Sequence, residues 1–82
     1  MSTIKQTATD TALITLNWFF EANRERFADN PKALEEIAKT EALAETKTEA
    51  FWEPLVAEVA GYSQHGRAMH FAKALAAEIQ AK

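Results

Sequence analysis

Residues 10–28 read Asp10-Thr-Ala-Leu-Ile-Thr-Leu-Asn-Trp-Phe-Phe-Glu-Ala-Asn-Arg-Glu-Arg-Phe-Ala28, and this stretch decides the fold class. Its main apolar side chains recur at the helical period and share one broad face: Ala12, Leu13, Leu16, Phe19, Phe20 and Phe27. Asp10 is a good N-cap residue, so we predict a helix over residues 10–28. Asn23 lies within the apolar face and needs a hydrogen-bond partner there if it is buried.

A second apolar stripe lies on the other side of this predicted helix. It consists of Ile14, Trp18 and Ala22. Either neighbouring elements surround the helix, or this stripe is a contact surface. Because tryptophan is enriched at binding hot spots, we predict that these three residues form a protein interface.

A second helix is predicted to begin at Asn30-Pro31, a capping residue followed by a proline at the first helical position. Its buried stripe is predicted to consist of Leu34, Ile37 and Ala38. The pattern ends after Glu41, where Leu43 falls on the opposite side, and a break at residues 43–47 is expected.

The third predicted helix is ambiguous at its start. Thr46 and Glu49 have the spacing of a capping box, and helical periodicity follows in Phe51, Trp52, Leu55, Val56 and Val59. Pro54 leaves two alternatives open: a kinked helix from Thr46, or a turn over residues 46–52 before a helix that begins near Pro54. Gly61 is predicted to end the helix as its C′ residue.

Ser63 is predicted to cap a fourth helix that runs to Gln80. Its apolar face consists of Ala68, Ala72, Leu75, Ala76 and Ile79, and the small alanines predict close packing against the first and third helices. The predicted fold is therefore all-α: a compact four-helix bundle, or three helices with one short helix. We expect a flexible segment over residues 1–9 and a single helical domain over residues 10–82.

The composition excludes several classes of protein. The 82 residues suit one domain, and the absence of cysteine excludes disulfides, thiolate zinc sites and a cysteine nucleophile. The net charge is −3, with a net −5 over residues 29–60 and +2 over residues 61–82. The polar N-terminus has no secretory signal, and the longest apolar run, Trp18-Phe19-Phe20, cannot span a membrane. A cytoplasmic protein that does not contact membranes is expected.

Few residues are arranged for chemistry. His65 and His70 are five residues apart and diverge by about 140° on a helix, whereas a zinc pair needs i and i+4 on one face. Ser63 and His65, at i and i+2, do not aim at one point, and no glycine-rich phosphate loop is present. We therefore expect no catalytic residue, no metal, no cofactor and no small-molecule substrate.

Residues 55–73 have the pattern of a helix–turn–helix. Ala57 precedes Gly61 by four residues, which is the usual relation between the first helix and the turn. The second helix would expose side chains able to contact bases and phosphates: Gln64, His65, Arg67, His70 and Lys73. The stretch is also similar to the DNA-binding segment of alkylguanine transferases, although the chain has no cysteine to carry their activity.

Two functions are thus expected. The first is a non-enzymatic adaptor, inhibitor or accessory subunit, such as small acidic helical proteins of phage or plasmid origin often are. It would bind a larger protein or a second copy of itself through the aromatic patch around Trp18. The alternative is a small DNA-binding regulator that uses residues 55–80, with Arg67 and Lys73 on phosphates.

Overall fold

The computed structural model describes residues 7–81 and contains four helices there, as the sequence predicts. They are α1 (Ala8–Arg26), α2 (Pro31–Glu45), α3 (Glu49–Glu58) and α4 (Gln64–Gln80). The predicted flexible segment 1–9 falls mostly outside the described residues, and Ala8 and Thr9 already belong to α1. The all-α fold and its four helices are confirmed.

The N-cap of helix α1 lies three residues before the predicted one. Thr7, not Asp10, is the N-cap, and its hydroxyl accepts a hydrogen bond from the Asp10 backbone N–H at 3.0 Å. The N–H groups of Ala8 and Thr9 donate to the Glu49 carboxylate from α3, each at 2.9 Å. These two donors are unsatisfied in an isolated helix, so a residue distant in sequence completes the first turn.

Helix α2 begins as predicted, because Asn30 accepts a hydrogen bond from the Ala33 backbone N–H at 3.1 Å. It continues to Glu45, beyond the expected end of the pattern. Leu43, predicted to face away from the core, is half-buried and packs against it, whereas Ala38 is exposed. The prediction was wrong here because neighbouring helices cover different sides of α2 along its length.

Helix α3 matches neither of the two alternatives predicted around Pro54. It begins at Glu49 and includes Pro54, so neither a start at Thr46 nor one near Pro54 is correct. The predicted capping box does not form: Thr46 ends α2, and its hydroxyl donates to the Leu43 carbonyl at 2.7 Å. Gly61 is not a left-handed C′ residue either, since no residue in the described range has a positive φ.

Helix α4 spans the predicted residues, and the Ser63 hydroxyl accepts from the Gly66 backbone N–H at 3.1 Å. In the core, Trp52 stacks edge-on against Phe71, with 5.8 Å between the ring centroids. Full burial of such side chains stabilises the fold by about 1.5–3 kcal/mol each. The largest fully buried side chains are Trp52, Phe71, Leu16, Leu75 and Val59.

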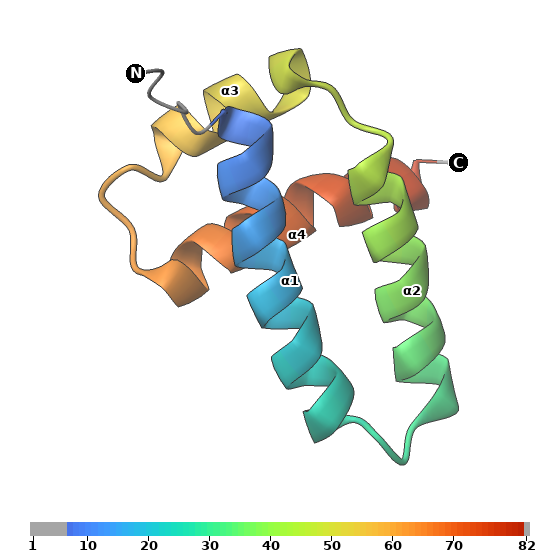
Figure 1. Cartoon of the computed structure of the whole chain (residues 1–82). Helices are drawn as coiled ribbons and strands as arrows, with labels where there is room; N and C mark the ends of the chain where they lie inside the picture. Colours follow the sequence, from blue (N-terminus) through green and yellow to red (C-terminus); the bar gives the residue numbers. More distant parts are fainter. Residues whose placement is uncertain (1–6, 82) are drawn as a thin grey trace, which may run out of the picture.

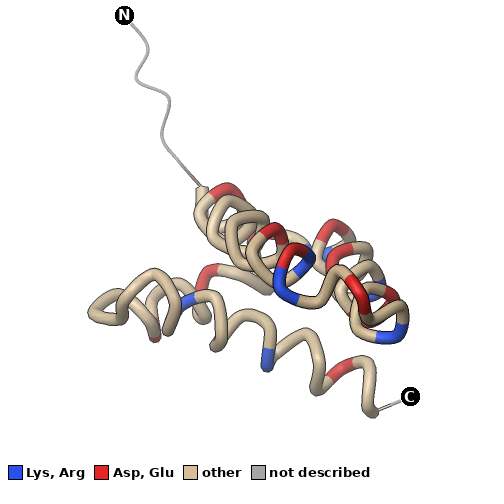
Figure 2. Tube along the Cα trace, turned by 90° about the horizontal axis from the view of Figure 1, so that it is seen from below, with Lys and Arg blue, Asp and Glu red and all other residues tan. Residues whose placement is uncertain are grey.

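The helices form two layers. Helices α1 and α2 make an antiparallel hairpin, and α4 crosses behind both of them (Figure 1). The view from below shows the hairpin in one layer and α4 in the other (Figure 2). α4 crosses the half of the hairpin nearest the start of α1, and the half that carries the α1–α2 loop extends past it (Figure 1). This offset creates the surface described next.

Candidate protein-interaction surfaces

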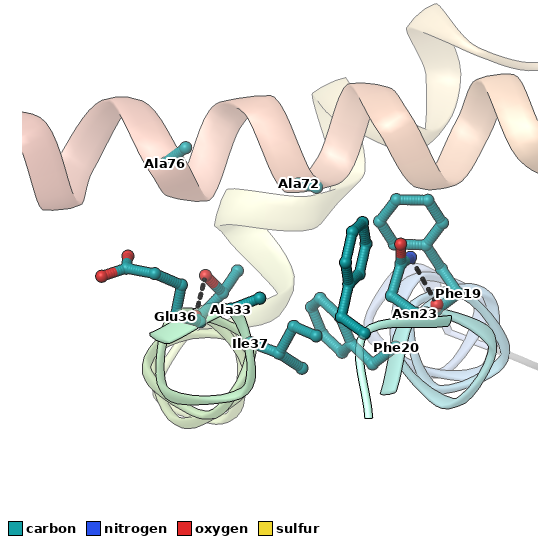
Figure 3. A pocket seen from close by; sticks show the side chains of 10 residues that line it. Phe19, Phe20, Asn23, Ala33, Glu36, Ile37, Ala72 and Ala76 are labelled. Atoms are coloured by element: carbon teal, nitrogen blue, oxygen red, sulfur yellow. Dashed lines mark hydrogen bonds between the residues drawn. The ribbon is translucent and has the colours of Figure 1, made fainter. Parts of the chain in front are cut away.

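An apolar groove lies between the uncovered half of the hairpin and α4. Its volume is about 290 Å³, and it is open to solvent. Figure 3 shows α4 on one side of the groove, with α1 and α2 opposite. The lining residues come from all three helices: Phe19, Phe20, Asn23 and Phe27 from the α1 side, Ala33, Glu36, Ile37 and Thr40 from α2, and Ala72 and Ala76 from α4.

The groove exists because large side chains on the hairpin face small ones on α4. Phe27 is the C-cap of α1 and remains 38% exposed, although its position in the helical period predicts burial. Ala68 is fully buried, whereas Ala72 and Ala76 are half-buried and line the groove. The alanines expected to bring helices together therefore leave open volume at this end of α4.

The polar groups of the groove are mostly satisfied. The Asn23 side-chain amide donates to the Phe19 carbonyl at 2.8 Å, which provides the partner that its position requires. The Thr40 hydroxyl donates to the Glu36 carbonyl, also at 2.8 Å. Glu36 is the one charged lining residue, and the Lys39 ammonium lies 3.8 Å from its carboxylate. The groove is thus an apolar surface with a single acidic group on its α2 wall.

The predicted interface stripe lies on another face of α1. Ile14 is 58% exposed and Trp18 is 41% exposed, and Ala22 is exposed as well. The surface around Trp18 also includes Glu21, Arg24 and Glu25. It comes from one helix and carries three charged side chains. That Ile14, Trp18 and Ala22 contact a partner stays a prediction.

An ion pair beside Trp18 joins α1 to α2. Arg24 donates two hydrogen bonds to the Glu41 carboxylate, at 2.8 and 3.1 Å. Hydrogen bonding to Glu41 raises the pKa of Arg24, so the guanidinium stays charged. The paired, two-point geometry links the two helices of the hairpin outside the lining of the groove.

The side chains expected to face DNA mostly contact the protein itself. Arg67 donates from Nε to the Val59 carbonyl at 3.2 Å and from Nη2 to the Ala60 carbonyl at 3.1 Å. His70 Nε2 lies 2.9 Å from a Glu58 carboxylate oxygen. The His65 ring lies edge-on to Phe19, with centroids 6.0 Å apart. Gln64 and Lys73 are exposed.

Residues 7–81 lack two further features. No group of three or more histidine, cysteine, aspartate or glutamate side chains there is arranged to hold a metal ion. None of the helices in this range combines the length and the apolar character needed to cross a membrane.

No protein-family model matches the chain, and no curated protein or solved structure is significantly similar to it.

Proposed function

We propose that this chain is a non-enzymatic protein-interaction module, of the adaptor, inhibitor or accessory-subunit kind, that binds a larger protein in the groove between α1, α2 and α4. One observation carries the proposal: α4 covers only one half of the hairpin (Figure 1), and Phe27 remains 38% exposed beside an apolar groove. Apolar patches with a polar rim are typical of protein-binding surfaces.

The chemistry of the lining supports binding over catalysis. Asn23 and Thr40 already donate to carbonyls of their own helices, and Glu36 is the one charged lining group. General acid–base catalysis uses titratable side chains within hydrogen-bond reach of the substrate, and Glu36 is the one titratable side chain in the lining.

The Trp18 face is a second candidate surface for the same kind of function. Trp and Ile are exposed there beside Glu21 and Glu25, which would form an acidic rim. The groove is favoured because three helices shape it, whereas one helix supplies the residues around Trp18. The DNA-binding alternative would require Arg67 and His70 to exchange their contacts with Val59, Ala60 and Glu58 for phosphates.

Site-specific photo-cross-linking in the native host tests the proposal. The photoreactive amino acid p-benzoyl-phenylalanine replaces Thr40 in the groove or, in a separate protein, Trp18. We expect the group at position 40 to capture a discrete protein. That protein, once purified, should bind the unmodified chain and bind the Phe27→Glu variant at least tenfold more weakly.

Two results would contradict the proposal. One is the absence of any cross-linked protein from position 40 while the chain is folded and present. The other is a purified partner whose affinity is unchanged by Phe27→Glu. If position 18 alone yields a partner that Trp18→Ala abolishes, the binding surface is the Trp18 face and the groove is not the site.

A further inference from the structure

We infer that the occupant of the groove is an amphipathic helix of the partner, which lies alongside α4 and directs lysine or arginine side chains toward the α1–α2 hairpin. This inference rests on the proposed function and names the chemistry of the partner. It is based on the packing of α4 across one half of the hairpin.

Helix α4 crosses the hairpin in one half and buries Phe71 and Leu75 in the core cluster with α1 residues. The other half of the hairpin contributes Phe27, the C-cap of α1, and Ile37 from α2 to the lining of the open groove, and Phe27 is 38% exposed there. A helix of about 12–16 residues is roughly 18–24 Å long, which is enough to cross two helices whose axes lie about 8–10 Å apart.

The side of α4 that lines the groove can pack closely against another helix. Ala72 and Ala76 are one turn apart, and both line the groove. Such small side chains allow the backbone of a second helix to approach closely. The volume of about 290 Å³ is at the lower end of the range for small-molecule sites, so it suits one or two large apolar side chains from a helix.

The net negative charge of the hairpin favours a basic occupant. The hairpin, residues 8–45, contains eight acidic and four basic side chains, and one of the acids, Glu36, is on the groove wall. The ion pairs of Arg24 with Glu41, and of Lys39 with Glu35 and Glu36, engage acids as well as bases, so the hairpin keeps its net charge of −4. Opposite charge across an interface favours the correct partner and speeds association.

A second copy of this chain is a poorer occupant on the same grounds. Its helices α1, α2 and α3 carry net charges of −1, −2 and −3. Only α4 is positive, at +1, and its apolar face is buried in the core. An acidic helix beside an acidic hairpin would be repelled.

The probe is a synthetic, fluorescein-labelled peptide of about 16 residues, with leucines along one helical face and lysines and alanines elsewhere. We expect saturable binding to the full chain by fluorescence anisotropy, at least tenfold weaker for the Phe27→Ala variant. Trp18→Ala is the matched control because Trp18 is 41% exposed and Phe27 is 38% exposed, on different faces of the same helix. It should change the affinity by less than twofold.

A second pair of variants tests the charge. Glu36→Gln should weaken the lysine peptide about two- to fivefold, more at low salt than at high salt, and should not weaken a peptide with glutamine in place of lysine. The matched control is Glu25→Gln, which makes the same charge change beside Trp18.

If Phe27→Ala fails to fold by circular dichroism, Ala76→Phe serves instead, since it fills the groove from α4 and should abolish binding.

The inference is overturned if a scrambled peptide of the same composition binds as well, or if Phe27→Ala and Ala76→Phe leave the affinity unchanged.

The experiments distinguish failure of this inference from failure of the proposed function. A partner cross-linked at position 40 that depends on Phe27 but has no helix in the captured segment refutes the helical occupant alone. Concentration-dependent dimerisation by sedimentation that Ala76→Phe abolishes would assign the groove to a second copy. Absence of both peptide binding and any cross-linked partner refutes both proposals.

Discussion

The carboxylate of Glu49 caps the N-terminus of a helix that begins 41 residues earlier in the chain. It accepts hydrogen bonds from the backbone N–H groups of Ala8 and Thr9, and from the Thr9 hydroxyl at 2.8 Å. The bond from the Thr9 N–H contributes most to lowering the pKa of Glu49, followed by that from Ala8, because both stabilise the charged form. One side chain thus joins α3 to the start of α1.

Glu49→Gln is expected to lower the melting temperature at pH 7, because an amide oxygen accepts these bonds more weakly than a carboxylate. The pKa of Glu49 in the folded state lies below its usual value of 4.5. Its contribution to stability is therefore fully present above that pH and is lost as the pH falls through the folded-state pKa. Thermal melts should show the gap between wild type and variant closing below about pH 4.5.

The exposed Glu53 on the same helix provides the control. Glu53→Gln should shift the melting temperature little at any pH. A gap for Glu49→Gln that stays constant from pH 7 to pH 3 would contradict the assignment of this cap.

Gly61 gives a second test at a single residue. Its φ is not positive, and a Cβ built on it meets no atom within 4 Å. Gly61→Ala should therefore stabilise the chain by about 0.4–1 kcal/mol, chiefly by restricting the unfolded state. Urea denaturation measures this, and a loss of stability would instead support the left-handed conformation that the sequence suggests.

The starts of α2 and α4 could be predicted from sequence because their caps are local. Asn30 and Ser63 each accept a hydrogen bond from the N–H three residues on. The cap of α1 is equally local, since Thr7 accepts from the Asp10 N–H, but the sequence pattern predicts Asp10 as the cap in its place. The start of α3 could not be predicted, because Glu49 is used by α1 and is not free to form a capping box with Thr46. Local patterns thus predict a helix boundary only where tertiary contacts leave the local partners free.

Arg67 belongs to the junction between α3 and α4. Its guanidinium donates to the carbonyls of Val59 and Ala60, which follow the last turn of α3. The Val59 carbonyl also accepts a hydrogen bond from the Tyr62 backbone N–H at 2.9 Å. The helix–turn–helix pattern in the sequence predicts that this residue contacts phosphate, and that role stays a prediction. In the structure, the Arg67 side chain instead links the first turn of α4 to the end of α3.

Arg67→Ala should destabilise the chain by about 1 kcal/mol, the net value of a typical hydrogen bond. Arg67→Lys should recover only part of this, since an ammonium lacks the planar, two-point geometry. Chemical denaturation distinguishes the three proteins. If Arg67→Ala has unchanged stability but weaker binding to duplex DNA, the phosphate role is favoured over the structural one.

At the scale of the whole molecule, the sequence predicts the class of fold but not the groove. Phe27 and Ile37 belong to the apolar stripes of their helices, and periodicity alone assigns them to the core. Whether they are covered depends on where α4 crosses the hairpin, which is a tertiary property. By contrast, the exposure of Ile14 and Trp18 follows from their position opposite the main stripe, and it is observed.

Filling the groove should not harm the fold. Ala76→Phe adds a large apolar side chain to open volume of about 290 Å³, so we expect a melting temperature equal to or higher than that of the wild type. Ala68→Phe is the matched comparison, since Ala68 is fully buried and overpacking there costs about 1–3 kcal/mol or more. Equal destabilisation by both would mean that the groove is closed in solution.

The central claim is that a basic amphipathic helix binds in this groove. The most direct test is a titration of the isotope-labelled chain with the leucine–lysine peptide, followed by NMR of the backbone amides and the indole N–H groups. We expect the largest shift changes at Phe27, Ile37 and Ala76, and an unchanged Trp18 indole. Changes centred on Ile14 and Trp18, or no saturable change anywhere, would contradict the account.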